Sequence, residues 1–386
     1  MSYDNSAVYL DNAATTPLDP AILEVMLPYL TREQGNPSSV HGPGVAARRA
    51  VEGAREQVFA ALGSRLTELV FTSGGTEANN LALFGYARLR KGDQLVISSV
   101  EHPSVHRAAE SVSNLLGIPC RQVRVDSAGR LDLNHLGDLL TEKTSVVSLI
   151  HGQNEYGSVQ PVLEAAAIVR ERAPRAHLHL DTVQSFGKIS VEPLAAVADS
   201  LSLSAHKLHG PKGAGALALF SRSRPVPRLE GRGQENGRRA GTANGAGAVG
   251  FGMAAARAAR NLAANGPRLA LMNEQVLSCL EQLPDTRLLG SRSHRLPTIA
   301  AALLGGVPGE VLQHHLEQRG VVIGTGSACH AGRNRISPTY KALGLDLEQA
   351  RSVIRISLSY QTSAEDLDRL LTELPAALSE VRELIR

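Results

Sequence analysis

One stretch decides both the fold and the chemistry of this chain: Ser204-Ala205-His206-Lys207-Leu208-His209-Gly210-Pro211-Lys212-Gly213. It follows a short alternating segment, 200–204, and precedes a second apolar segment, 216–220, so Lys207 is expected where a strand gives way to a Gly/Pro turn. Burial lowers the pKa of a lysine held in such a place, and its neutral amine can then attack a carbonyl. Lys207 is therefore a candidate to form a Schiff base with an aldehyde cofactor.

A carboxylate upstream supports this interpretation. The segment 177–180 predicts a buried strand that ends at Asp181. Pyridoxal phosphate needs a lysine for its aldehyde and an Asp or Arg partner for its ring nitrogen, so Lys207 and Asp181 together suggest this cofactor. Lys207 alone is weak evidence, because most lysines are solvated surface charges.

Composition sets the broad class of the protein. The 386 residues suffice for two domains, and 43% hydrophobic with 20% charged residues is an ordinary balance for a soluble protein. A net charge of +3 is too small to indicate nucleic acid or a membrane surface, and no apolar run is long enough for a membrane helix. Three cysteines without a spacing pattern predict neither a disulfide framework nor a metal site. The start of the chain lacks the features of a signal peptide, so the cytoplasm is the expected compartment.

Strand-like segments alternate with helical ones along the first half of the chain. This alternation predicts right-handed βαβ units and a mainly parallel sheet. Ligands of such sheets bind beyond the carboxyl ends of the strands. Five polar residues follow strand ends there: Thr76, His102, Asn154, Asp181 and Lys207.

The segment Ser73–Asn80 follows a predicted strand and leads into a helix. A Gly-rich turn at a helix N-terminus can bind a phosphate through its backbone amides. The same residues also fit an ordinary capped helix, with Ser73 or Thr76 as the cap and Glu77 in the first turn. Near Asp19-Pro20 the pattern of a capping Asp and a first-turn Pro predicts another helix start.

Several further residues leave two interpretations open. Cys120 and Cys279 lie on apolar patterns and are expected in the core, whereas Cys329 lies in a Gly-flanked loop that suits an accessible thiol. Arg355, in the strand-like segment 352–359, could bind a carboxylate or could be an exposed arginine on an edge strand. The Gly/Arg-rich segment 231–242 is either a flexible basic loop or a functional loop over an anion or a subunit interface.

Taken in order, these motifs resemble one family, the NifS/IscS-like cysteine desulfurases, which are fold type I pyridoxal phosphate enzymes of the class V aminotransferase group. The resemblance runs from Tyr9 to the last predicted helix. It is carried by collinear segments: 10–17, 35–39, 71–77, 101–103, 154–157, Asp181 with Gln184, 204–213, 239–242, 326–329 and 355–357.

The resemblance implies an α/β architecture of two domains. A large domain, 15–255, would hold the cofactor on a mainly parallel seven-stranded sheet. A smaller α+β domain, 1–14 with 256–386, would carry the mobile cysteine loop. The family pattern also implies a homodimer.

The resemblance further implies roles for the residues around the cofactor. Lys207 would form the Schiff base, Asp181 would pair with the ring nitrogen and His102 would stack on the ring and take part in proton exchange. Gln184 would donate a hydrogen bond to the ring hydroxyl. The phosphate would be held by a second group: Gly75, Thr76, Ser204, His206 and, from the other subunit, Thr242.

For the substrate, the resemblance implies that Asn154 and Arg355 bind the carboxylate of L-cysteine. Cys329 would attack the substrate sulfur, leaving L-alanine and a persulfide for an iron–sulfur scaffold or another sulfur acceptor. Three alternatives stay open: a selenocysteine lyase, another class V enzyme such as an aminotransferase, and a non-catalytic scaffold or sulfur carrier.

The chain departs from the family pattern at a few places. Gln153 replaces a usual Asn, Thr182 a usual Ala and Asn236 a frequent Arg. Beyond the cysteine, the segment 333–336 carries Arg333 and Arg335 and reverses the local charge. This reversal is expected to affect the choice of sulfur acceptor, since charges at the rim of an interface set partner choice and association rate.

Overall fold

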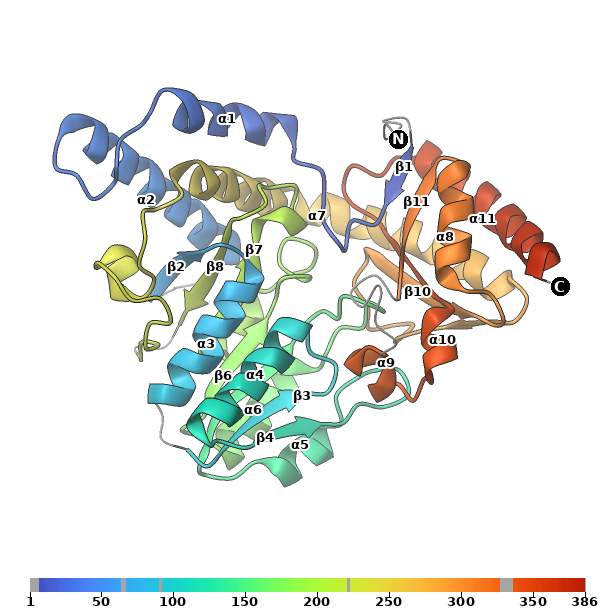
Figure 1. The fold of residues 1–386 in the computed structure, drawn as a ribbon, viewed down its shortest axis with the longest axis horizontal. Helices are drawn as coiled ribbons and strands as arrows, with labels where there is room; N and C mark the ends of the chain where they lie inside the picture. The colour runs from blue at the N-terminus through green and yellow to red at the C-terminus, as the bar shows by residue number, and fades with distance from the viewer. Residues whose placement is uncertain (1–6, 64–66, 90–91, 221–222, 327–335, 386) are drawn as a thin grey trace.

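The computed structural model describes residues 7–63, 67–89, 92–220, 223–326 and 336–385. Within these ranges the chain forms two β-sheets, each packed on its own hydrophobic core, with helices around both (Figure 1). None of the described helices combines the length and the apolar character that crossing a bilayer requires.

The larger sheet has seven strands in the order β2-β8-β7-β6-β5-β3-β4. The strands are β2 (Glu68–Thr72), β3 (Gln94–Ser98), β4 (Cys120–Val123), β5 (Thr144–Ile150), β6 (His177–Asp181), β7 (Ser200–Ser204) and β8 (Gly215–Leu219). Adjacent strands in the part β7-β6-β5-β3-β4 of this order pair in parallel. Strand β8 is antiparallel to both of its neighbours, β7 and β2. The predicted mainly parallel sheet is confirmed. Every residue of β5 to β8 is buried, as expected for strands covered on both faces.

Helices surround this sheet, and short helical turns link its strands. The helices are α1 (Pro20–Thr31), α2 (Gly42–Leu62), α3 (Gly75–Leu89), α4 (Pro103–Leu116), α5 (Leu133–Leu139) and α6 (Val162–Arg172), with 3-10 turns η1 (Glu192–Ala196), η2 (Ala205–Lys207) and η3 (Gln234–Gly237). The predicted start of α1 is confirmed, because the Asp19 carboxylate accepts a hydrogen bond from the amide of Ala21 at 2.9 Å. At α3, which begins at Gly75, neither alternative cap directly precedes the helix, since Ser73 lies two residues before it and Thr76 inside it. Glu77 lies in the first turn as expected, and its carboxylate accepts from the Ser73 amide at 2.6 Å.

The smaller sheet has five strands in the order β1-β11-β12-β10-β9. These are β1 (Val8–Leu10), β9 (Thr286–Leu288), β10 (Ile299–Leu304), β11 (Val321–Thr325) and β12 (Val353–Ser357). The pair β1–β11 is parallel and the others are antiparallel. The remaining helices are α8 (Gly309–Gln318), α9 (Pro338–Ala342), α10 (Leu347–Arg351) and α11 (Ala364–Ile385).

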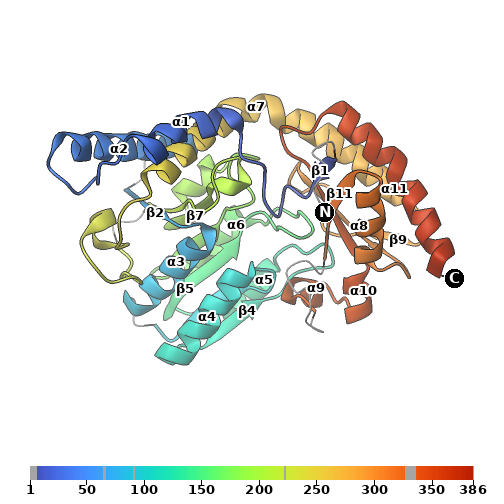
Figure 2. The same ribbon diagram turned by 45° about the horizontal axis from the view of Figure 1, so that its top comes forward.

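One long helix, α7 (Gly245–Gln282), runs along both sheets (Figure 2). Its first half contributes Phe251 and Ala254 to the core under the larger sheet, and its second half contributes Met272 and Val276 to the core of the smaller one. The half-buried Cys279 packs on the second core and Cys120 on another, so both cysteines are packing residues as predicted.

The Gly/Arg-rich segment 231–242 is tied to the larger sheet by a buried carboxylate. Glu235, 9% exposed, accepts from both terminal nitrogens of Arg55 at 3.0 and 3.1 Å and from the Phe71 amide at 2.8 Å. Arg55 also donates to the Leu69 carbonyl. Glu235 adopts a left-handed backbone conformation, φ 47°, so these contacts hold a strained turn in place.

We expect Glu235→Ala to destabilise the protein strongly, because it removes the inner carboxylate of Arg55, leaves only the exposed Glu52 to pair with that guanidinium and takes the acceptor from the Phe71 amide. The expected loss is about 3–5 kcal/mol in urea unfolding. Glu52→Ala is the matched control: Glu52 pairs with the same arginine but is 54% exposed, so its removal should cost less than about 1 kcal/mol. Equal losses in the two variants would contradict this account of the loop.

Candidate active site

A cavity of about 330 Å³ opens at the carboxyl ends of the parallel strands and is closed on one side by the smaller sheet. Ten of the predicted site residues line it together: Gly75, Thr76, His102, Asn154, Asp181, Gln184, Ser204, His206, Lys207 and Arg355. They come from six separate segments of the chain. Five of these follow strands of the larger sheet and meet because those strands end at one edge, and the sixth, Arg355, comes from the smaller sheet. Ala13, Ala14, Asn79 and Ser104 also line this cavity and were not singled out from the sequence, although the first three lie in segments that carried a functional signal.

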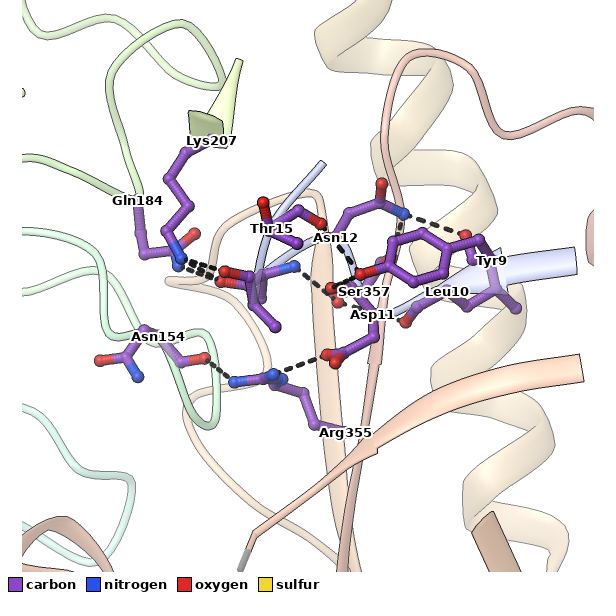
Figure 3. A network of polar contacts seen from close by, with 12 residues as sticks. Tyr9, Leu10, Asp11, Asn12, Thr15, Asn154, Gln184, Lys207, Arg355 and Ser357 are labelled. Carbon is purple, nitrogen blue, oxygen red and sulfur yellow. Dashed lines mark hydrogen bonds and ion pairs between the residues drawn. The ribbon is translucent and has the colours of Figure 1, made fainter. Parts of the chain in front are cut away.

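Lys207 ends the turn η2, directly after β7. Its amine donates to the carbonyl oxygens of Ala13 at 2.6 Å and Ala14 at 2.8 Å (Figure 3). These carbonyls belong to the segment between β1 and α1, which crosses from the smaller sheet to the larger one. The amine therefore lies inside the cavity, next to a backbone acceptor pair.

Asp181 is the last residue of β6 and is 3% exposed. One carboxylate oxygen accepts from the side-chain amide of Asn79 at 2.8 Å and the other from the backbone amide of Val183 at 3.0 Å. Both donors are neutral N–H groups on rigid elements. They fix the plane of the carboxylate at the cavity wall.

His102 precedes α4 and caps it: its Nδ1 accepts from the Ser104 amide at 3.1 Å. The Ser104 hydroxyl lies 2.8 Å from the same nitrogen. Burial lowers the pKa of His102; the charge of Asp181 opposes this effect, and that of Lys207 adds to it. The imidazole is therefore neutral near pH 7.

The opposite end of the cavity has the features of an anion site. Gly75 is the first residue of α3, and a side chain there would meet Val183, since an added Cβ would lie 2.5 Å from its Cγ2. Gly75, Thr76 and Ser204 line the cavity together, and the first-turn amides of a helix are suited to binding an anion. Burial, helped by the charges of Lys207 and other nearby lysines, lowers the pKa of His206 to about 4.

Arg355 lies on β12, the middle strand of the smaller sheet, and is 5% exposed. The alternative of an exposed edge-strand arginine is therefore wrong. Its guanidinium donates to the backbone carbonyl of Asn154 at 3.0 Å and to the Asp11 carboxylate at 2.6 Å (Figure 3). Asp11 was not singled out from the sequence, although it lies in the segment 10–17 that carries the resemblance.

Gln184 is held from both sides. Its amide nitrogen donates to the Ala13 carbonyl at 2.8 Å, and its oxygen accepts from Lys188 at 2.7 Å. Lys188 is a second amine close to the cavity. Burial, together with the charges of Lys207 and Arg355, lowers the pKa of Lys188 to about 7.

Two predicted residues lie apart from this group. Thr242 is exposed and lines a separate cavity of about 220 Å³ with Arg239 and Glu235. Cys329 lies outside the described residues.

Three of the departures from the family pattern have local partners. The side-chain oxygen of Gln153 accepts from the Tyr156 amide at 3.0 Å. The Thr182 hydroxyl donates to the Ser202 carbonyl at 2.9 Å, and the Asn236 amide donates to Glu68 at 2.9 Å. The fourth departure, 333–336, lies almost entirely outside the described residues.

Comparison with known proteins places the chain in a family. The model of the class-V aminotransferases matches residues 8–370. The chain belongs to the class-V aminotransferase family. Within the family it is 37% identical to a protein of Sinorhizobium fredii named "Cysteine desulfurase", over 97% of each chain. It superposes on a solved "NIFS-LIKE PROTEIN" with a TM-score of 0.89 and 33% identity, covering 97% of this chain and 100% of the other. A structure described as "SspA in complex with cysteine" matches at a TM-score of 0.78 and 31% identity, over 91% and 98%.

The cofactor of this family is pyridoxal phosphate, and the cavity suits it. A lysine amine, a carboxylate, a neutral imidazole and a helix N-terminus without a side chain at Gly75 line one space. The side-chain oxygen of Asn154 is buried and has no hydrogen-bond partner among the described residues, so it is available to a ligand.

We expect Lys188 to make stability depend on pH. Its pKa of about 7 in the folded protein lies below the usual 10.5, so the unfolded chain binds more protons between these values. Stability should therefore rise with pH across this window and level off below it. The thermal midpoints of the cofactor-free wild type and of Lys188→Met, measured from pH 6.5 to 9.5, check this. The midpoint of the wild type should rise relative to that of the variant; parallel curves would refute a lowered pKa.

Proposed function

We propose that this protein is a pyridoxal phosphate-dependent cysteine desulfurase, which converts L-cysteine to L-alanine and leaves a persulfide on Cys329. The observation that carries the proposal is the single cavity that gathers ten residues predicted from sequence. The names of its relatives, and the cysteine in the SspA structure, support the reaction and the substrate.

The proposed roles of the cavity residues are those that the family resemblance implies, and their common place in one cavity supports them. Lys207 holds the aldehyde of the cofactor, Asp181 its ring nitrogen and His102 the face of its ring. When bound, the cofactor supplies an electron sink that makes the α-proton of an amino acid acidic. Lys207 is the base that takes this proton and returns it.

The phosphate is assigned to the opposite end of the cavity, where Gly75, Thr76, Ser204 and His206 lie. Gln184 approaches the ring hydroxyl. Its amide nitrogen donates one of its two hydrogens to the Ala13 carbonyl, and the second hydrogen can go to the ring hydroxyl.

Arg355 and Asn154 are assigned to the substrate carboxylate. Arg355 offers a guanidinium fork, and Asn154 a buried side chain whose oxygen has no partner in the described part of the chain. The substrate carboxylate must share or displace the contact of Arg355 with Asp11.

Sulfur transfer is assigned to Cys329. Its thiolate attacks the substrate Sγ, so that an S–S bond forms, the Cβ–Sγ bond breaks, and the electron pair with a proton passes to Cβ, which becomes the methyl group of alanine. A thiol reductant or an acceptor protein then removes the outer sulfur. The acceptor is expected to be an iron–sulfur scaffold or a thio-modification protein.

The proposal includes the organisation of the molecule. We divide the chain into a large domain, 15–255, and a small domain, 1–14 with 256–386, on the basis of the two sheets and their separate cores. We also propose a homodimer in the cytoplasm. Thr242, which lies outside the cavity of its own chain, would reach the phosphate of the partner.

Turnover of L-cysteine with a reductant tests the reaction. We expect equal amounts of alanine and sulfide from the wild type, and none from Cys329→Ala, which should keep its bound cofactor. Cys279→Ala is the matched control, because that half-buried thiol only packs against the core of the smaller sheet and its loss should leave turnover unchanged. Full turnover by Cys329→Ala would exclude this nucleophile.

Complementation tests the dimer and the role of Thr242. Lys207→Ala and Thr242→Ala should each lose function alone. If Thr242 acts across the interface, mixed dimers contain one intact site, and co-expression should restore turnover to a fraction of the wild-type value. Sedimentation should show a dimer. A monomer that binds the cofactor fully, or an inactive mixture of proven mixed dimers, would refute the assignment.

A further inference from the structure

A buried asparagine on α3 connects two of the residues that face the cofactor. Asn79 is 1% exposed and lines the cavity. Its amide nitrogen lies 2.8 Å from the Asp181 carboxylate and 2.9 Å from the Ser104 hydroxyl. A carboxylate only accepts hydrogen bonds when ionised, so this contact fixes which end of the Asn79 amide faces Asp181.

The contacts of Asn79 continue through Ser104 to His102. The two amide hydrogens of Asn79 go to Asp181 and to the Ser104 oxygen. His102 Nδ1 accepts from the Ser104 amide and therefore carries no proton, so the Ser104 hydroxyl, 2.8 Å away, is the donor in their contact and keeps its oxygen free to accept from Asn79. The single proton of neutral His102 thus resides on Nε2.

A second histidine, His179, contacts the oxygen of the same Asn79 amide. The oxygen of Asn79 lies 3.0 Å from His179 Nε2, which must be the donor. His179 Nδ1 then accepts, and the Ser200 hydroxyl lies 2.9 Å from it. Ser200 in turn lies 2.8 Å from His177 Nε2. Burial lowers the pKa of His179 to about 4, against the charge of Asp181, so the ring stays neutral and keeps this arrangement.

We propose that Asn79 is a positioning residue that orients the Asp181 carboxylate directly and, by donating to the Ser104 hydroxyl, supports the hydrogen bond from that hydroxyl to Nδ1 of His102. The two side chains that it contacts come from β6 and from the start of α4, and Asn79 from α3, so the amide joins three elements at the floor of the cavity. The inference rests on the proposed cofactor site.

The test uses pairs of near-isosteric variants. Asn79→Leu keeps the volume and removes both donors. Asn80→Leu is the matched control, because the neighbouring Asn80 donates to the carbonyl of Thr76 in its own helix and does not line the cavity. Ser104→Ala removes the hydroxyl that links Asn79 to His102 and leaves the contact between Asn79 and Asp181 in place.

Binding of pyridoxal phosphate to the cofactor-free protein is measured first, by the visible circular dichroism of the bound cofactor. Asn79→Leu should raise the dissociation constant about tenfold or more, since a hydrogen bond to a charged group is lost. Asn80→Leu and Ser104→Ala should stay within about twofold of the wild type. A wild-type dissociation constant in Asn79→Leu overturns the proposal. If the wild type itself binds no cofactor, the failure is that of the proposed function.

The second readout is the titration of His102 in the cofactor-loaded protein, followed by NMR of labelled histidine rings and assigned from its loss in His102→Gln. The charged and titratable neighbours are Asp181, Lys207 and His106. Ser104→Ala should raise the midpoint, because a donor to Nδ1 is lost, whereas a structural serine would leave it unchanged. This variant carries the test if Asn79→Leu does not fold, and an unchanged midpoint overturns the assignment of Asn79 to His102.

Discussion

The contact on which the site depends is the buried ion pair between Arg355 and Asp11, two residues 344 positions apart. It joins the middle strand of the smaller sheet to the segment that crosses to the larger one. That segment supplies the carbonyl oxygens that receive the Lys207 amine. Breaking the pair would leave a guanidinium without its carboxylate in a water-poor interior, which is costly. The pair therefore helps to hold the segment that closes the cavity, together with two hydrogen bonds from this segment to Ser357.

The same pair affects what an anionic substrate gains on binding. A substrate carboxylate that reaches Arg355 meets a guanidinium that already has an anionic partner. Its net gain is then the difference between two similar contacts, not the full strength of one. Selectivity would have to come from the rest of the cavity, including the unpartnered oxygen of Asn154.

Charge in the cavity is unevenly divided. Beyond the effect of burial, the charges of Lys207 and Arg355 lower the pKa of Lys188, and the charges of Lys207 and Lys188 lower that of His206. Near this cavity, burial and the charge of Asp181 raise the pKa of Glu101 well above its usual value, which favours the uncharged form of that carboxyl group. The excess of positive charge suits a phosphate and a carboxylate at once.

Sequence reasoning identified most of the residues that line the cavity, because strand ends can be recognised from apolar runs followed by turns. It missed Asn79, Asp11 and Lys188, because nothing local separates a buried polar side chain from a solvated one. The burial of Arg355 could not be predicted from the sequence either. It follows from the central place of β12 in the smaller sheet, and the order of strands in that sheet is not visible in the sequence.

The parallel pairing of β1 with β11 links Val8 to Val321. A chain emerging from the ribosome makes β1 first, yet the strand that completes its hydrogen bonds comes more than three hundred residues later. The seven-stranded sheet uses only residues 68–219 and can assemble in the meantime. The crossing segment has no smaller sheet to anchor it until the end of synthesis. The segment that closes the cavity is thus the last part of the site to be fixed in place. Until then Lys207 stays accessible, and the cofactor can enter.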